Sequence, residues 1–152
     1  MMDYHYIPLK TMAEEFHLEV VFAASDYNAI RLTVADVTRP GLQLAGYMDH
    51  FEPMRLQVMG NAETSYLRRL SPAARYQVLD KLFSYKFPAM LIARNIEPDP
   101  ECLEIAKKHD VTVLRTGETT SSIISSIISY LNAQMAGRIT RSFSSRITRP
   151  CI

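Results

Sequence analysis

The chain contains only two cysteines in 152 residues, Cys102 and Cys151. They lie far apart and form neither a disulfide framework nor a Cys-x-x-Cys metal motif. Apolar runs are also short, because none approaches the roughly 20 residues that a membrane-spanning helix needs. The first ten residues lack the basic segment and apolar stretch of a secretory signal peptide. These absences predict a cytoplasmic protein in a reducing compartment, with no membrane association.

Recognisable catalytic motifs are absent as well. The sequence has no GxxxxGK[ST] phosphate-binding loop, and its many serines include no Gly-x-Ser-x-Gly nucleophile motif. The four histidines show no His-x-x-x-His spacing for a metal ion. His50, beside Asp49 and Glu52, forms the one acid/base grouping, and a solvated turn is its expected explanation. The sequence therefore predicts no catalytic residue and no metal ligand.

Acidic residues are missing from the C-terminal end. Four arginines follow Glu118 without any acidic residue: Arg138, Arg141, Arg146 and Arg149. Such a basic, serine-rich end could contact nucleic acid or an acidic partner surface. A solvated linker is the simpler interpretation, and nucleic-acid binding is not expected. We therefore expect one domain over residues 1–137 and a flexible basic tail over residues 138–152.

What is present is typical of one globular domain, with 47% hydrophobic and 22% charged residues. Thr11 and Glu14 form a capping box, the signature of a helix start. Ser71 and Asp99 each precede a proline at a first helical position. These signals and the sequence between them predict helices over about residues 11–17, 61–70, 72–84 and 100–109.

The clearest helix is the stretch TTSSIISSIISYLNAQM, residues 119–135. Its apolar residues recur at helical spacing, whereas serines occupy the opposite face. The apolar set is Ile123, Ile124, Ile127, Ile128, Leu131 and Met135. Pairs of isoleucines every four residues cannot lie on one side of a strand. We predict a long helix with one face in the core.

Short apolar runs separate the helices: EVVFA, IRLTVADV, MRLQVM, AMLIA and VTVLR. In the second half of the chain, strands and helices alternate with connections of a few residues. Parallel strands joined by right-handed helical crossovers satisfy such an order. The predicted fold class is α/β, a small, mostly parallel sheet flanked by helices.

Ligands of open parallel sheets bind outside the carboxyl ends of the strands. Three arginines follow the predicted strands, and their forked donors suit a phosphate or carboxylate. The free N–H groups at the start of the isoleucine-rich helix also suit an anion. The candidate ligand-binding residues are Arg39, Gly41, Asn61, Arg94, Arg115, Thr116, Thr119 and Thr120.

Several residues that follow the strands also have a purely structural interpretation. Thr119 and Thr120 can cap the isoleucine-rich helix, and Gly117 can relieve a positive φ angle. Arg39 precedes a proline, which restricts it to an extended conformation and can point it into solvent.

The stretch VADVTRPGLQLAGYMDHF, residues 34–51, interrupts an apolar background with two glycines, a proline and charged residues. Its Pro-Gly pair predicts a turn. Leu42, Leu44 and Tyr47 are expected to pin this loop to the core. We expect a structural loop at the strand ends, where binding is possible and catalysis is not expected.

Three segments in this order, RPGLQLAGY, MGNAETSYL and VTVLRTGETT, resemble one protein family. Over residues 5–140 the chain is similar to the N-terminal domain of HPr kinase/phosphorylase. The resemblance implies a fold similar to the first domain of the Mur ligases. It also implies that catalysis belongs to a C-terminal P-loop domain. In that domain the family uses ATP to phosphorylate a serine of the phosphocarrier HPr, and it removes the phosphate group again by phosphorolysis. Both reactions belong to bacterial sugar regulation.

Where the family would continue toward its P-loop, this chain reads SFSSRITRPCI. The chain is expected to be either a fragment or a stand-alone relative, and the unmatched basic tail favours the second. ATP and magnesium would belong to the kinase domain, so no cofactor is expected here.

The expected function is a non-catalytic regulatory or interaction domain. One expected partner is a second copy of the chain, since the resemblance implies an enzyme that forms homohexamers. The other expected partners are HPr or a P-loop kinase domain. The alternative is a sensor that binds a small anionic ligand, a phosphate- or nucleotide-bearing metabolite, at the strand ends.

Overall fold

The computed structural model describes the backbone of residues 6–147 and the side chains of residues 6–136. Its centre is a five-stranded sheet with the order β2-β7-β6-β5-β4. The strands are β2 Glu19–Phe22, β4 Val37–Thr38, β5 Leu56–Met59, β6 Ala89–Ile92 and β7 Thr112–Arg115. Strands β4, β5, β6 and β7 pair in parallel, and β2 pairs with β7 in antiparallel orientation at one edge. The predicted α/β class with a mostly parallel sheet is confirmed.

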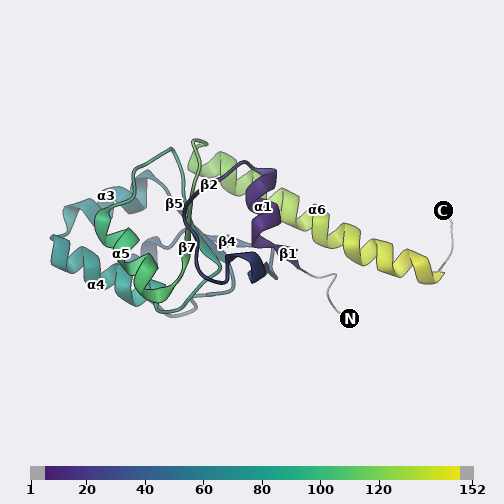
Figure 1. Cartoon of the computed structure of the whole chain (residues 1–152), viewed down its shortest axis with the longest axis horizontal. Helices are drawn as coiled ribbons and strands as arrows, with labels where there is room; N and C mark the ends of the chain where they lie inside the picture. Colours follow the sequence, from purple (N-terminus) through teal and green to yellow (C-terminus); the bar gives the residue numbers. More distant parts are fainter. Residues whose placement is uncertain (1–5, 148–152) are drawn as a thin grey trace.

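Helices cover both faces of this sheet, as Figure 1 shows. On one face lie the short α2 and three longer helices: α2 Gly41–Leu44, α3 Asn61–Arg69, α4 Pro72–Phe83 and α5 Pro100–His109. On the other face lie α1 Leu9–Glu15 and α6 Thr120–Ile147. The two faces are covered by different parts of the chain, because the connection after β7 crosses from one face to the other.

Each face of the sheet has its own hydrophobic core. Successive side chains of a strand point to opposite faces, so Val58 and Leu91 pack with α1 and α6. Met90 and Ile92 pack instead with helices α3, α4 and α5. Both cores therefore depend on the same four-residue strands.

The first helix begins earlier than its capping signal predicts. It starts at Leu9, after Pro8, and Thr11 lies inside it without a capping hydrogen bond. The reason is tertiary, because Ile7–Pro8 forms a short strand, β1, that pairs with β3, Arg31–Leu32. The Leu9 amide donates to the carbonyl of Ile30 at 2.9 Å, which satisfies a group that a cap would otherwise serve.

The predicted strand at residues 30–37 is divided in two. Its first part is β3, which pairs with β1 in a separate two-stranded sheet, and its second part becomes β4 of the main sheet. The other predicted strands and the helices at 61–70, 72–84 and 100–109 are confirmed to within three residues at each end.

Helix α6 is longer than the predicted 119–135. It begins at Thr120 and continues to Ile147, across the expected domain boundary at residue 137, and Figure 1 shows its second half projecting past α1. The arginine side chains of the expected tail lie outside the described residues. Within the part of the chain that the structure describes, no helix combines the length and apolarity needed to cross a membrane.

Candidate functional site

The carboxyl ends of the parallel strands lie along one edge of the sheet and are tied together by backbone hydrogen bonds. The Ala93 amide, after β6, donates to Met59 of β5 at 2.9 Å. The Thr116 amide, after β7, donates to Ile92 at 2.9 Å. This edge, the strand-end rim, therefore holds the loops that contain the predicted binding residues.

Arg39 follows β4 and forms a forked ion pair with Glu63 of α3. Its Nε and Nη2 donate to the two carboxylate oxygens, each at 3.0 Å. One of these oxygens also accepts the Gly60 amide at 2.8 Å. Burial raises the pKa of the Glu63 carboxyl, but the hydrogen bonds from Arg39 and Gly60 offset this, so the pKa lies below its ordinary value.

Glu63 is the rim residue that sequence reasoning missed. Its side chain is buried and closes the N-terminus of α3 by accepting the Gly60 amide. The signal was available, because Glu three residues after an N-cap is half of a capping box. The side chain of Arg39 is exposed, as one interpretation predicted, but its guanidinium is paired with Glu63 rather than free in solvent.

Arg115, at the end of β7, lies between two carboxylates. Its Nε donates to Glu19 of β2 at 2.9 Å, and its Nη1 donates to Glu97 at 3.0 Å. These hydrogen bonds raise the pKa of Arg115 above its ordinary value. The guanidinium thus joins the antiparallel edge strand to the loop after β6.

Arg94 and Asn95 follow β6 with consecutive left-handed backbones, at φ angles of 60° and 55°. The Arg94 amide donates to the backbone carbonyl of Glu118 at 2.8 Å, whereas its exposed guanidinium has no partner among the described side chains. Gly117 was expected to relieve a positive φ angle, and this is wrong. The left-handed turn occurs at Arg94–Asn95, where the chain must leave β6 and meet the loop after β7.

Two helix N-termini converge on Gly60, α3 from one face of the sheet and α6 from the other. Thr120 packs so closely on Gly60 that a Cβ atom there would lie 2.0 Å from the threonine Oγ1. Thr120 is 4% exposed, and its hydroxyl has no hydrogen-bond partner among the described residues. Thr119 caps α6, because its Oγ1 accepts the Ser122 amide at 3.3 Å, as one interpretation predicted.

The turn that contains Gly41 exposes more apolar surface than expected. Leu44 is fully buried, as predicted. Leu42 is 64% and Tyr47 49% exposed, so the expectation that both pin the loop to the core is wrong. Helix α2 has only four residues, and a single turn can present just one of its side chains to the core.

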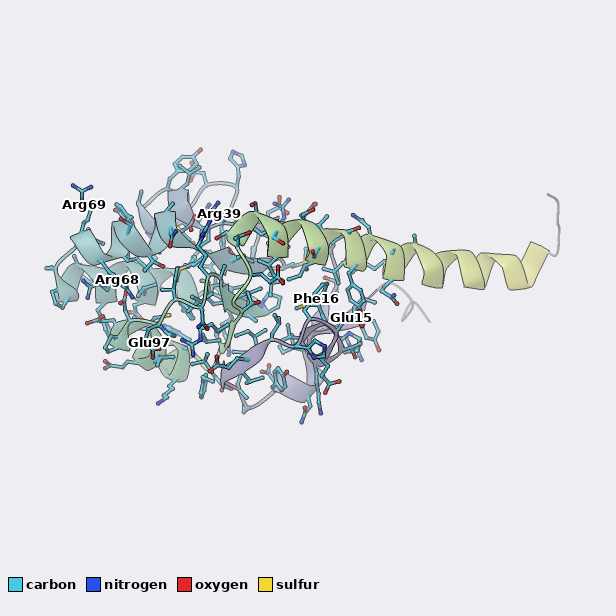
Figure 2. The ribbon with its side chains drawn as sticks, turned by 90° about the horizontal axis from the view of Figure 1, so that it is seen from above. Glu15, Phe16, Arg39, Arg68, Arg69 and Glu97 are labelled. Atoms are coloured by element: carbon cyan, nitrogen blue, oxygen red, sulfur yellow. The ribbon has the colours of Figure 1, made fainter. Side chains whose placement is uncertain are left out.

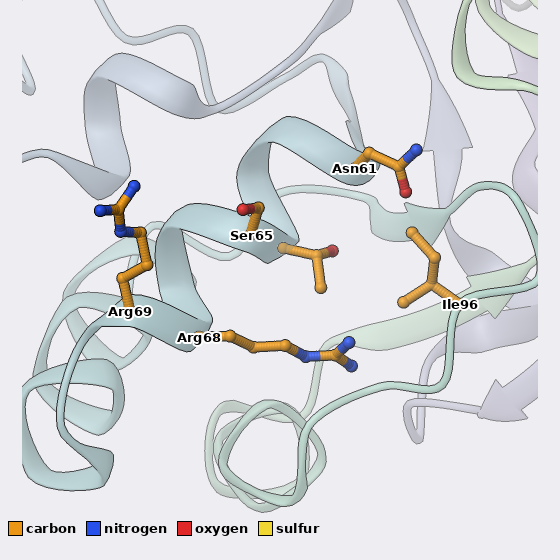
Figure 3. A pocket seen from close by; sticks show the side chains of 6 residues that line it. Asn61, Ser65, Arg68, Arg69 and Ile96 are labelled. Carbon is orange, nitrogen blue, oxygen red and sulfur yellow. The ribbon is translucent and has the colours of Figure 1, made fainter.

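An open groove of about 430 Å³ runs along α3 beside the rim. Figure 3 shows Asn61 and Ile96 at one end of it and Arg69 at the other, with Arg68 reaching across. Thr64 and Ser65 complete the lining. Of these residues, only Asn61 was a sequence candidate. Thr64 and Ser65 belong to the segment MGNAETSYL, but that segment did not indicate a groove, because the groove arises from packing α3 against the loop after β6.

Residues 6–136 contain no metal-binding cluster, and the cysteine among them is buried. Within that range, no three His, Cys, Asp or Glu side chains lie close enough to hold a metal ion. Burial raises the pKa of the Cys102 thiol to about 12, which keeps it protonated and unreactive. His50, Asp49 and Glu52 lie exposed in a turn.

The family model for the HPr serine kinase N terminus matches residues 7–131. The HPr kinase/phosphorylase of Caldanaerobacter subterraneus subsp. tengcongensis is 37% identical over 134 residues, 88% of this chain and 44% of that protein. That of Streptococcus thermophilus is 37% identical over 132 residues, 87% of this chain and 43% of that protein. The chain thus spans less than half the length of these curated relatives.

A solved structure shares the fold at lower identity. It is the regulatory region of a Clostridium perfringens pyrophosphatase, with CBS and DRTGG domains and the activator diadenosine tetraphosphate. The TM-score is 0.55 at 16% sequence identity, and the match covers 79% of this chain and 45% of that chain. This likeness supports the α/β architecture.

The family model covers most of the residues that form the sheet, both cores and the strand-end rim. The sequence resemblance to HPr kinase/phosphorylase is thereby confirmed, and this chain belongs to the family of HPr serine kinase N-terminal domains.

Proposed function

We propose that this chain is a non-catalytic regulatory domain that acts by protein association. Its relatives are HPr kinase/phosphorylases, and this chain matches their N-terminal part. The sequence holds no phosphate-binding loop of the GxxxxGK[ST] type. ATP and magnesium chemistry would therefore belong to a P-loop kinase domain, and the role of this domain would be assembly.

The observation that carries the proposal is the exposed apolar turn at α2. Leu42 and Tyr47 project from a segment that Leu44 anchors in the core. Exposed leucine and tyrosine side chains on an anchored turn suit a protein contact, because their burial removes apolar area from water. We propose that the contact is with a second copy of the chain.

The test is the molecular mass in solution, measured by analytical ultracentrifugation over a range of concentrations. The wild-type chain is expected to self-associate, and Leu42→Glu is expected to shift it to the monomer. Met54→Glu is the matched control, because Met54 is 57% exposed. It precedes β5 and therefore lies at the amino ends of the strands, whereas α2 follows the carboxyl end of β4. A monomeric wild type, or equal effects of both variants, would contradict the proposal.

The non-catalytic part of the proposal has a separate test. The purified chain, incubated with HPr and magnesium ATP, is expected to produce no phosphoserine on HPr by mass spectrometry. A full-length relative, such as the enzyme from Streptococcus thermophilus, serves as the positive control. Phosphorylation by this chain alone would refute the proposal.

A second candidate function is a sensor of phosphate-bearing metabolites at the strand-end rim. The observation in its favour is the convergence of the α3 and α6 N-termini, whose free amides attract anions, around the unpartnered Thr120 hydroxyl. The guanidinium groups of Arg39 and Arg115 already form ion pairs with carboxylates. Arg94 is the rim arginine left to bind an anion, and Gly41, Asn61, Thr116 and Thr119 are the further candidates that follow the strands.

A thermal-shift titration with sugar phosphates and nucleotides tests the sensor function. A ligand at about 100 times its dissociation constant adds roughly 2.7 kcal/mol of stability. Arg94→Ala is expected to abolish the shift, whereas Arg115→Ala is expected to lower the melting temperature without changing the shift. A shift that survives in Arg94→Ala would exclude the rim as the binding site.

A further inference from the structure

We infer that the groove along α3 binds the phosphate group of a small phosphorylated molecule. The site is distinct from the guanidinium of Arg94 and does not require the sensor function at the rim. Figure 2 places Arg68, Arg69 and Glu97 at the end of the molecule away from the projecting part of α6, with Arg39 between them and the start of α6.

Five of the six residues that line the groove carry a hydrogen-bond donor. Its polar residues are an asparagine, a threonine, a serine and two arginines: Asn61, Thr64, Ser65, Arg68 and Arg69. Each can donate at least one hydrogen bond, and no carboxylate belongs to the lining. A phosphate group offers oxygens that accept several such bonds at once.

Arg68 is held in place by groups outside the groove. Its Nε donates to Asp99 at 3.0 Å, and its Nη2 donates to the carbonyl of Glu97 at 2.9 Å. Figure 3 shows the side chain extended toward Ile96. The remaining Nη1 has no partner among the described residues. A guanidinium fixed in this way loses little conformational entropy when it binds an anion.

Arg69 supplies the net positive charge of the groove, because Asp99 neutralises the charge of Arg68. Its guanidinium is exposed and has no partner among residues 6–136. The neighbouring carboxylates are engaged elsewhere, since Asp99 pairs with Arg68 and Glu97 pairs with Arg115. The groove therefore retains one uncompensated positive charge, which suits an anionic ligand.

The size of the groove favours a small molecule. Its volume of about 430 Å³ falls within the range of roughly 300–1,000 Å³ that small-molecule sites occupy. Ile96 adds an apolar surface at the end where Asn61 lies. A phosphate near the arginines would leave the rest of the ligand to contact Asn61, Ser65 and Ile96.

Isotope-labelled protein, titrated with potassium phosphate and with glucose 6-phosphate, tests the site. Potassium chloride of equal ionic strength and glucose are the reference titrations. Amide chemical shifts of Ser65 and Arg69 are expected to change with the phosphate-bearing probes alone. Arg69→Glu is expected to weaken binding by about tenfold or more, the effect of losing a charged hydrogen-bond partner.

Lys81→Glu is the matched control. Lys81 lies in the last turn of α4, as Arg69 lies in the last turn of α3, and both residues are exposed. The control is expected to bind like the wild type. Equal weakening in both variants would overturn the proposal, because it would reflect net charge only. Loss of binding in Arg94→Ala but not in Arg69→Glu, or shift changes confined to residues 116–120, would place the ligand at the rim and overturn it too.

Discussion

Gly60 is the residue at which the two layers of helices meet most closely. Its φ angle of −128° is accessible to any residue, so backbone conformation does not demand glycine. Space does, since the Thr120 hydroxyl occupies the position that a Cβ atom needs. At this point the N-termini of α3 and α6 pack against each other.

We predict that Gly60→Ala destabilises the fold by about 1–3 kcal/mol, because the added methyl group overpacks this contact. The measurement is the free energy of unfolding in urea. Gly41→Ala is the control and is expected to be nearly neutral, because nothing lies within 4 Å of its added Cβ. Adding Thr120→Ala is expected to recover much of the loss. If Gly60→Ala and Gly41→Ala behave alike, the contact is not a tight one.

The sequence indicates which residues stand at helix starts better than it indicates their hydrogen-bond partners. The sequence indicated that Ser71 caps α4, and its Oγ accepts the Ala74 amide. It also indicated Asp99 as a cap, but Asp99 begins α5 without a capping hydrogen bond and accepts Arg68 instead. A local signal fails where a charged partner distant in sequence offers a stronger hydrogen bond.

At the scale of elements, one aspartate ties α4 to α5. Asp80 of α4 accepts hydrogen bonds from two residues of α5, His109 at 2.7 Å and Lys108 at 3.0 Å. The bond from His109, followed by that from Lys108, holds the pKa of the Asp80 carboxyl below its ordinary value of 3.8. These two helices share a core with β6 and β7.

This arrangement predicts an acid-dependent loss of stability. A carboxyl group with a lowered folded-state pKa stabilises the fold above its unfolded pKa, and the contribution disappears as pH falls through the folded value. Between pH 5 and pH 2.5, the wild type is expected to lose more unfolding free energy than Asp80→Asn. Asp49→Asn, at an exposed position without an ion pair among the described residues, is expected to follow the wild type. Parallel pH profiles for wild type and Asp80→Asn would contradict this role.

At the scale of the whole molecule, one sheet connects two hydrophobic cores. Ile127 of α6 and Leu79 of α4 are fully buried on opposite faces. Every strand between them contributes residues to at least one of the cores, and the inner strands contribute to both. Loss of packing on one face therefore weakens the support of the other.

We predict that Ile127→Ala and Leu79→Ala each cost about 2–5 kcal/mol in one cooperative transition. Urea unfolding followed by far-ultraviolet circular dichroism and by tyrosine fluorescence is expected to give coincident curves for each variant. Ile128→Ala, at a half-buried position of the same helix, is the control and is expected to cost less. Separate transitions by the two probes would show that the cores unfold independently.

The order of the main helices and strands and the α/β class follow from local patterns in the sequence. These patterns are the helical spacing of apolar residues, the prolines at helix starts and the short apolar runs. Each involves residues close together in the sequence, so it is visible without a structure. The same reading placed Arg39, Asn61, Arg94 and Arg115 at the carboxyl ends of strands, because connectivity alone sets that edge.

The contacts of those residues depend on the tertiary structure. Glu63 and Glu19 engage Arg39 and Arg115 because the sheet brings together segments far apart in sequence. Pairing of β1 with β3 set the start of α1, and the single turn of α2 left Leu42 exposed. Hydrogen bonds, ion pairs and burial depend on three-dimensional proximity, which no local pattern in the sequence encodes.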